Sequence, residues 1–205
     1  LQGNVWRIRF PSNGAAPIIA RLFTATDAVG AVQPLTARPR VALRPDTVNQ
    51  VVVTVGTGSY FRVGDDSTGS SQVQTFFGVF DNEAASITNV TRNDLLAQTL
   101  TSNLVTVVKG SVSWPAGTLR YGTDHDIAAN HKGWRMDLPI FGERVISEAS
   151  YPSGSKQDRV RFTTLIPDPD PCGNGRRGFL MDVCLANGGE CTDPTFDLNM
   201  DCLLY

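Results

Sequence analysis

The sequence lacks the features that mark several large classes of protein. Although 41% of its 205 residues are apolar, no run approaches the roughly 18 consecutive apolar residues of a membrane-spanning helix. Its 18 basic and 20 acidic residues give a formal net charge of −2, so the chain has no global attraction for nucleic acid or acidic membranes. We therefore predict a soluble folded domain with no membrane span and no nucleic-acid partner.

Catalytic motifs are also scarce. There is no Gly-x-Ser-x-Gly elbow to expose a serine nucleophile, and the turn Gly56-Thr-Gly58 lacks the lysine and the helix of a phosphate-binding loop. Asp65 and Asp66 are adjacent, and adjacent side chains point apart, which disfavours shared acid–base chemistry. We predict that the chain is not an enzyme and that Gly56, Gly58 and Asp65 shape a turn.

The histidines and cysteines are the residues best suited to bind a transition metal. Asp124-His125-Asp126 and His131 offer nitrogen and oxygen atoms to a transition metal. No strand or helix spacing fixes their geometry, so a solvated loop is the favoured interpretation. The cysteines form no Cys-x-x-Cys pair, which makes a structural zinc site a poor match.

Two disulfides in an exported protein are favoured over free thiols. The four cysteines lie close together near the end of the sequence: Cys172, Cys184, Cys191 and Cys202. They allow three pairings, which the sequence alone does not decide. The preferred pairing joins Cys184 to Cys191 across an Ala-Asn-Gly-Gly turn, and Cys172 to Cys202.

A trace of a calcium loop is present in the same region. Asp197, Asn199 and Asp201 match the first three ligand positions of an Asp-x-[Asp/Asn]-x-[Asp/Asn]-Gly loop. Cys202 replaces the glycine, and the sequence stops before a closing acid. A polar turn is favoured over calcium binding here, and no other cofactor is predicted.

The arrangement of apolar residues predicts an all-β fold. Val51–Val55 has four apolar β-branched residues in five positions, and with Thr75–Phe80 it predicts two antiparallel strands of a sheet with little exposed face. Thr91-Arg-Asn-Asp fits a short helical turn or a strand about equally. Further strands are expected at Asn4–Phe10, Pro17–Thr24, Val41–Leu43, Leu104–Val112, Gly133–Leu138, Glu143–Ala149, Arg159–Leu165, Gly178–Leu185 and from Thr195.

The tryptophans are expected in the core. In Asn4–Phe10, the residues Trp6, Ile8 and Phe10 alternate with Val5, Arg7 and Arg9, which predicts one buried apolar face and one basic face. Core packing is also the default for Trp114 and Trp134, because each has a large apolar area to bury. Glycan stacking on exposed aromatic rings is the functional alternative.

Two parts of the chain share one order of elements. In Arg40–Asp81 and in Gly142–Leu185, a short strand leads to a hydrophobic strand, a glycine-rich polar loop and an aromatic strand. Antiparallel four-stranded units repeated radially are the blades of a β-propeller. We predict that residues 1–205 form a single partial β-propeller domain, with a β-sandwich as the alternative. Since the sequence starts at Leu1 rather than Met, it is expected to be a fragment of a longer protein.

Eight motifs also resemble, in order and almost from end to end, the C-terminal β-propeller of the PilC/PilY family of type IV pilus tip proteins. The motifs are Leu1-Gln-Gly-Asn-Val-Trp-Arg, Arg21-Leu-Phe-Thr-Ala, Gln33-Pro-Leu-Thr-Ala-Arg-Pro, Val55-Gly-Thr-Gly-Ser-Tyr-Phe-Arg-Val-Gly-Asp, Gln74-Thr-Phe-Phe-Gly-Val-Phe-Asp, Gly133-Trp-Arg-Met-Asp-Leu-Pro, Gly142-Glu-Arg-Val and Phe162-Thr-Thr-Leu-Ile-Pro.

The resemblance implies an exported protein at the pilus tip, at the cell surface, or in the outer membrane or periplasm. It implies roles in pilus biogenesis, twitching motility and surface adhesion. Expected partners are minor pilins, other pilus tip components, and a host or abiotic surface. The family tends to carry a calcium loop just before the strand that begins this sequence. The alternatives are a quinoprotein-like propeller enzyme, whose tryptophan-docking motifs are missing here, and a lectin-like glycan-binding adhesin.

Overall fold

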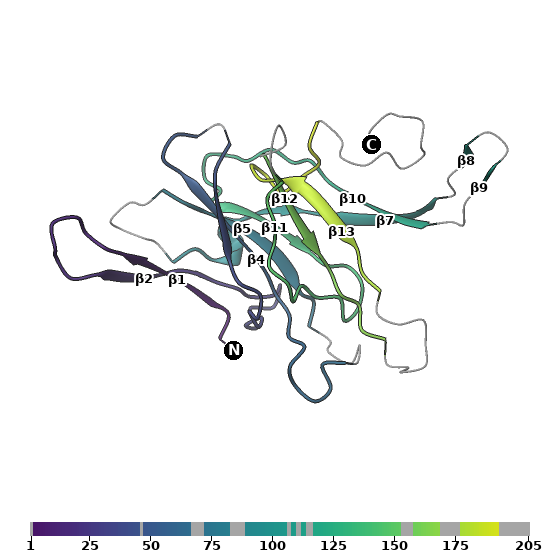
Figure 1. The fold of residues 1–205 in the computed structure, drawn as a ribbon, viewed down its shortest axis with the longest axis horizontal. Coiled ribbons are helices and arrows are strands. Elements are labelled where there is room, and N and C mark those ends of the chain that lie inside the picture. Colours follow the sequence, from purple (N-terminus) through teal and green to yellow (C-terminus); the bar gives the residue numbers. More distant parts are fainter. Residues whose placement is uncertain are drawn as a thin grey trace.

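Figure 1 shows the computed structural model, in which small antiparallel sheets surround a central five-stranded sheet. The structure describes residues 2–45, 47–66, 72–82, 89–105, 108–109, 112–113, 117–152, 158–168 and 177–192. Apart from one 3₁₀ turn, the regular elements in these ranges are strands. The same ranges contain no helix long and apolar enough to cross a membrane.

The central sheet has the strand order β3-β4-β5-β11-β6. Its strands are β3 (Arg40–Leu43), β4 (Val51–Gly56), β5 (Thr75–Asp81), β11 (Gly133–Asp137) and β6 (Leu96–Gln98). Neighbours pair antiparallel except β11 and β6, which are parallel. Every residue of β5 is buried, so the predicted pair of strands with little exposed face is confirmed.

One face of this sheet packs on a second hairpin, β12 (Arg159–Thr163) and β13 (Leu180–Cys184). At this contact the Phe76 ring stacks on Phe162, with their centroids 3.7 Å apart. Gly78 leaves room for buried Trp134, because a Cβ there would lie 2.3 Å from the indole. The strand predicted at Glu143–Ala149 is wrong: this segment forms no regular strand, and it and the residue after it make isolated bridges, Arg144 to Leu165 and Ser150 to Arg161.

The opposite face packs on the hairpin of β1 (Asn4–Arg9) and β2 (Ile18–Thr24). Phe23 meets Phe77 edge to face, with ring centroids 4.7 Å apart. Because both faces of the sheet are covered at β4 and β5, these two strands are continuous apolar runs, whereas the edge strand β3 alternates between partly buried and exposed residues.

The predicted inward face of β1 is wrong. Val5 is buried, but Trp6, Ile8 and Phe10 point outward and are 57%, 53% and 76% exposed. Arg7 instead turns inward, where its guanidinium lies 2.6 Å from the carboxylate of Asp81. Of the other tryptophans, Trp134 is buried as predicted, and Trp114 lies outside the described residues.

A long antiparallel arm extends from the body (Figure 1). It pairs β7 (Leu100–Val105) with β10 (Gly117–Gly122), and β8 (Val108–Lys109) with β9 (Val112–Ser113). The single strand expected at Leu104–Val112 is therefore divided among β7, β8 and β9. Before the arm, Thr91 precedes the 3₁₀ turn Arg92–Asp94, and the Asp94 carboxylate accepts hydrogen bonds from the Thr91 backbone N–H and hydroxyl.

Candidate functional site

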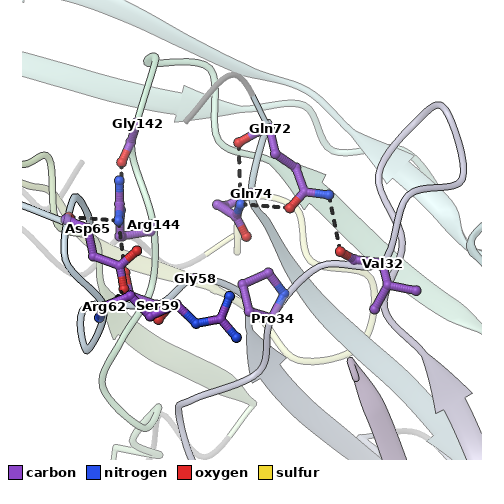
Figure 2. A pocket seen from close by; sticks show the side chains of 10 residues that line it. All are labelled: Val32, Pro34, Gly58, Ser59, Arg62, Asp65, Gln72, Gln74, Gly142 and Arg144. Atoms are coloured by element: carbon purple, nitrogen blue, oxygen red, sulfur yellow. Dashed lines mark hydrogen bonds between the residues drawn. The ribbon is translucent and has the colours of Figure 1, made fainter. Parts of the chain in front are cut away.

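A polar pocket of about 270 Å³ lies at the end of the central sheet where β4 ends and β5 begins. Figure 2 shows the side chains that line it, which come from residues 32–34, 58–65, 72–74 and 142–144. The loop that begins at Gly58 and runs to Asp65 forms one wall. Loops at the ends of strands are where rigid β scaffolds commonly carry binding residues.

Asp65 holds the turn of this wall. Its Oδ2 atom accepts hydrogen bonds from the Ser59 hydroxyl at 2.7 Å and from the backbone N–H groups of Phe61 and Arg62 at 2.9 and 2.8 Å. Burial raises the pKa of Asp65, but these hydrogen bonds and the nearby charge of Arg144 lower it, and the net shift is downward. The carboxylate is therefore a structural anion, which agrees with the predicted turn-shaping role.

Arg144 braces the same wall from the far side of the pocket. Its Nη1 donates to the backbone oxygens of Ser59 at 2.8 Å and Asp65 at 2.9 Å, and its Nε donates to Gly142 O at 2.9 Å. Burial lowers the pKa of Arg144. Gly58 has a φ of +139°, and a Cβ there would lie 2.5 Å from the Cβ of Arg144, so this approach requires glycine.

Two polar groups in the pocket are not used by the fold. The buried side chain of Gln74 donates from Nε2 to Gln72 at 3.3 and 3.4 Å, but its Oε1 has no hydrogen-bond partner. The guanidinium of Arg62 extends toward the middle of the pocket in Figure 2, near Pro34. It forms no ion pair with the described residues. The pocket thus presents a free cation and an unpartnered acceptor.

Comparison with known proteins identifies the family. The family model for the PilY1 beta-propeller domain matches residues 3–111, more than half of the chain. The chain belongs to the PilY1 β-propeller domain family. The PilC/PilY resemblance and the predicted fold, all-β and part of a β-propeller, are confirmed.

Several PilY1 proteins are similar to the chain over most of its length. The type IV pilus biogenesis factor PilY1 of Pseudomonas aeruginosa strain PAO1 is 26% identical over 97% of the chain, and that of strain UCBPP-PA14 is 29% identical over 87%. The chain spans only 20% and 17% of these relatives. The crystal structure of the P. aeruginosa PilY1 C-terminal domain matches all of the chain and 46% of that structure, with a TM-score of 0.80 at 23% identity.

In this member of the family, the cluster of Asp124, His125, Asp126 and His131 does not form a group of converging metal ligands. Asp124 Oδ1 accepts from the Asn187 amide at 2.7 Å, and His131 Nδ1 accepts from Ala128 N–H at 3.0 Å. Within the described part of the chain, the one group of three ligand side chains whose ligand atoms lie within 4.8 Å is Asp158, Cys184 and Cys191. Both cysteines are in a disulfide, so this group is not a free metal site.

The remaining predicted sites have different outcomes. Cys184 and Cys191 form the preferred disulfide, with an S–S distance of 2.03 Å. Cys172 and Cys202 lie outside the described residues, as do Asp197, Asn199 and Asp201 and the strand expected from Thr195. The second disulfide and the polar or calcium-binding turn therefore stay predictions.

Proposed function

We propose that the chain is an interaction module of an exported type IV pilus biogenesis factor, in which it supports pilus biogenesis, twitching motility and surface adhesion. The observation that carries this proposal is the similarity to PilY1 over 97% of the chain. Since the chain spans a fifth of that relative, we assign it a contribution to the whole protein's role. We further propose that residues 1–205 act as a single partial propeller domain.

The chemistry of the site supports binding rather than catalysis. Asp65 and Arg144 would be obvious candidates for an acid–base pair, but both are engaged in holding backbone groups of one loop. We assign minor pilins, other pilus tip components and an external surface as partners. The disulfide between Cys184 and Cys191 supports export, because disulfides persist in oxidising compartments.

The test is a chromosomal deletion of the segment that encodes these residues in the full-length protein. We expect fewer surface pili, smaller twitching zones and weaker attachment. A control strain carries Val29→Ser, a change at a highly exposed position, and should behave as the parent. Unchanged pilus number, motility and attachment in the deletion strain would exclude the proposal.

Exposed aromatic rings favour a second candidate, a glycan-binding adhesin. Trp6 of β1 and Phe10, which follows that strand, are exposed, and aromatic faces are suited to stacking on sugar rings. A glycan array should then show binding that disappears in Trp6→Ala. Binding that is absent, or equal in the variant, would remove this candidate.

A further inference from the structure

We propose that the pocket beside Arg62 binds an acidic side chain of a partner protein, presented on an extended segment with apolar flanking residues. This inference deepens the proposed function and rests on it, because it assigns to the pilus-related module a site for one kind of protein partner. The site is built from the walls described above and from the two polar groups that the fold leaves unused.

The charges of the pocket favour an anion. Its charged lining residues are Arg62, Arg144 and Asp65. The Asp65 carboxylate and the Arg144 guanidinium already hold the loop, so Arg62 supplies the free positive charge. A guanidinium pairs well with a carboxylate, because its N–H groups match the two oxygens.

The unpartnered Gln74 Oε1 offers the same ligand a hydrogen-bond acceptor. A buried acceptor without a hydrogen bond is unfavourable, and a ligand that carries an N–H close to its carboxylate would satisfy it. The backbone N–H near an Asp or Glu side chain meets this requirement. The cavity volume of about 270 Å³ lies just below the roughly 300 Å³ at which pockets for drug-sized molecules begin, which favours one anchoring side chain over a whole cofactor.

Exposed apolar side chains occur in the loops that form the pocket. Val32 lines it, Phe61 and Val63 stand on either side of Arg62 in the sequence, and Phe141 precedes Gly142. All four are exposed, Phe61 by 80%. Aromatic residues and arginine are enriched in protein–protein interfaces. We therefore assign apolar residues to the partner on both sides of its acidic anchor.

The test uses three synthetic peptides, Ac-Gly-Leu-X-Leu-Gly-NH₂ with X as Glu, Gln or Lys, titrated into the ¹⁵N-labelled chain. We expect the Glu peptide to shift the side-chain amide signals of Gln74 and the Nε–H signal of Arg62. The Gln and Lys peptides should bind roughly tenfold more weakly or not at all, as expected for loss of a charge-assisted hydrogen bond.

Arg62→Gln should weaken binding of the Glu peptide by roughly tenfold or more. The matched control is Arg9→Gln, which removes an exposed arginine of β1 that does not line the pocket, and it should leave the titration unchanged. Equal thermal unfolding of both variants and the parent shows that any loss is local.

The proposal is overturned if the Lys peptide produces the same shifts, or if Arg62→Gln binds as well as the parent. An equal response to free galacturonate, which has the carboxylate but no peptide, would exclude a protein segment as the preferred ligand. These results are independent of the deletion experiment, because peptide binding can fail while loss of the segment still reduces piliation.

Discussion

Arg120 and Glu143 form an ion pair inside the protein. Their side chains are 1% and 0% exposed, and Arg120 Nη1 and Nη2 reach the two carboxylate oxygens at 2.5 and 3.1 Å. The guanidinium also lies over the ring of Phe179, 3.6 Å from its centroid. Because both charged groups are shielded from water, each is stabilised mainly by its interaction with the other.

Removing one partner should therefore be costly. We expect Glu143→Ala to lower the free energy of unfolding by about 3–5 kcal/mol, since it leaves the Arg120 charge buried and unpaired. Urea denaturation measures the change. The control is Glu148→Ala, which breaks the exposed pair with Arg38 and should change stability little. Equal losses in the two variants would contradict the dependence on burial.

Asp65 should make stability depend on pH. Its pKa is lowered overall in the folded chain, so it contributes stability above its unfolded pKa of about 3.9 and loses that contribution as pH falls through the folded value. Asp65→Asn should be less stable than the parent at pH 6, with a gap that narrows below about pH 4. The midpoints of urea denaturation between pH 6 and pH 3 measure this difference in stability. A difference that does not change with pH would contradict the lowered pKa of Asp65.

The roles of the residues within the turn could be predicted from the sequence. The contacts that bring distant segments together at the pocket could not. Gly58 and Asp65 act within one turn, so their turn-shaping role follows from residue type and spacing. Arg144 reaches Ser59 across 85 positions of sequence, which no local pattern reveals. The alternation Gln72-Val-Gln74 before a buried strand was an available signal for a polar wall, but nothing in it indicates that Arg62 lies opposite.

The hairpin of β1 and β2 shows a limit of pattern analysis at the level of elements. Period-two alternation tells which residues share a face, and it grouped Trp6, Ile8 and Phe10 correctly. It does not tell which face is inward. The inward face carries Val5 and Arg7, and the guanidinium of Arg7 donates a hydrogen bond to Asp81, 74 positions away. In β4 and β5 the runs of β-branched and aromatic residues are buried on both faces, and they predicted the strands and their pairing.

Substitutions on the two faces of β1 should differ in their effects. Val5→Ala removes buried apolar volume and should cost about 1–3 kcal/mol of unfolding free energy. Trp6→Ala removes a larger but mostly exposed side chain and should cost less. Urea denaturation compares the two variants. A larger loss of unfolding free energy for Trp6→Ala would indicate that Trp6 is buried and would contradict the inward position of Arg7.

Across the whole molecule, three of the described sheets stack in layers: the central sheet and the hairpins β12–β13 and β1–β2. The central sheet contributes Phe76 to the contact with β12 and β13, and Phe77 to the contact with β1 and β2. Such face-to-face stacking is how neighbouring blades of a propeller bury their apolar surfaces. The two repeated units recognised in the sequence correspond to the central and the β12–β13 layers, whereas the outward face of β1 ends the stack with exposed apolar residues.

The disulfide between Cys184 and Cys191 closes a loop that connects the β12–β13 hairpin to the central sheet. The loop that it closes accepts a hydrogen bond from Trp134 Nε1 at Leu185 O, 3.0 Å away, and one from the Gln98 amide at Asn187 O, 3.1 Å away. Gly188 lies directly against the Trp134 ring, where a Cβ would approach to 2.4 Å. The loop after β13 is thus fastened to β11 and β6 of the central sheet.

Replacing Cys184 and Cys191 with serine should weaken the contact between this loop and the central sheet. For a closed loop of this length we expect a loss of about 2–3 kcal/mol in unfolding free energy. In a Trp6→Phe, Trp114→Phe background, the fluorescence of Trp134 should become more accessible to acrylamide, because the loop that covers its ring is no longer tethered. The background protein with the disulfide intact is the control. If quenching and stability are the same with and without the disulfide, the hydrogen bonds of Trp134 and Gln98 alone hold the two layers together.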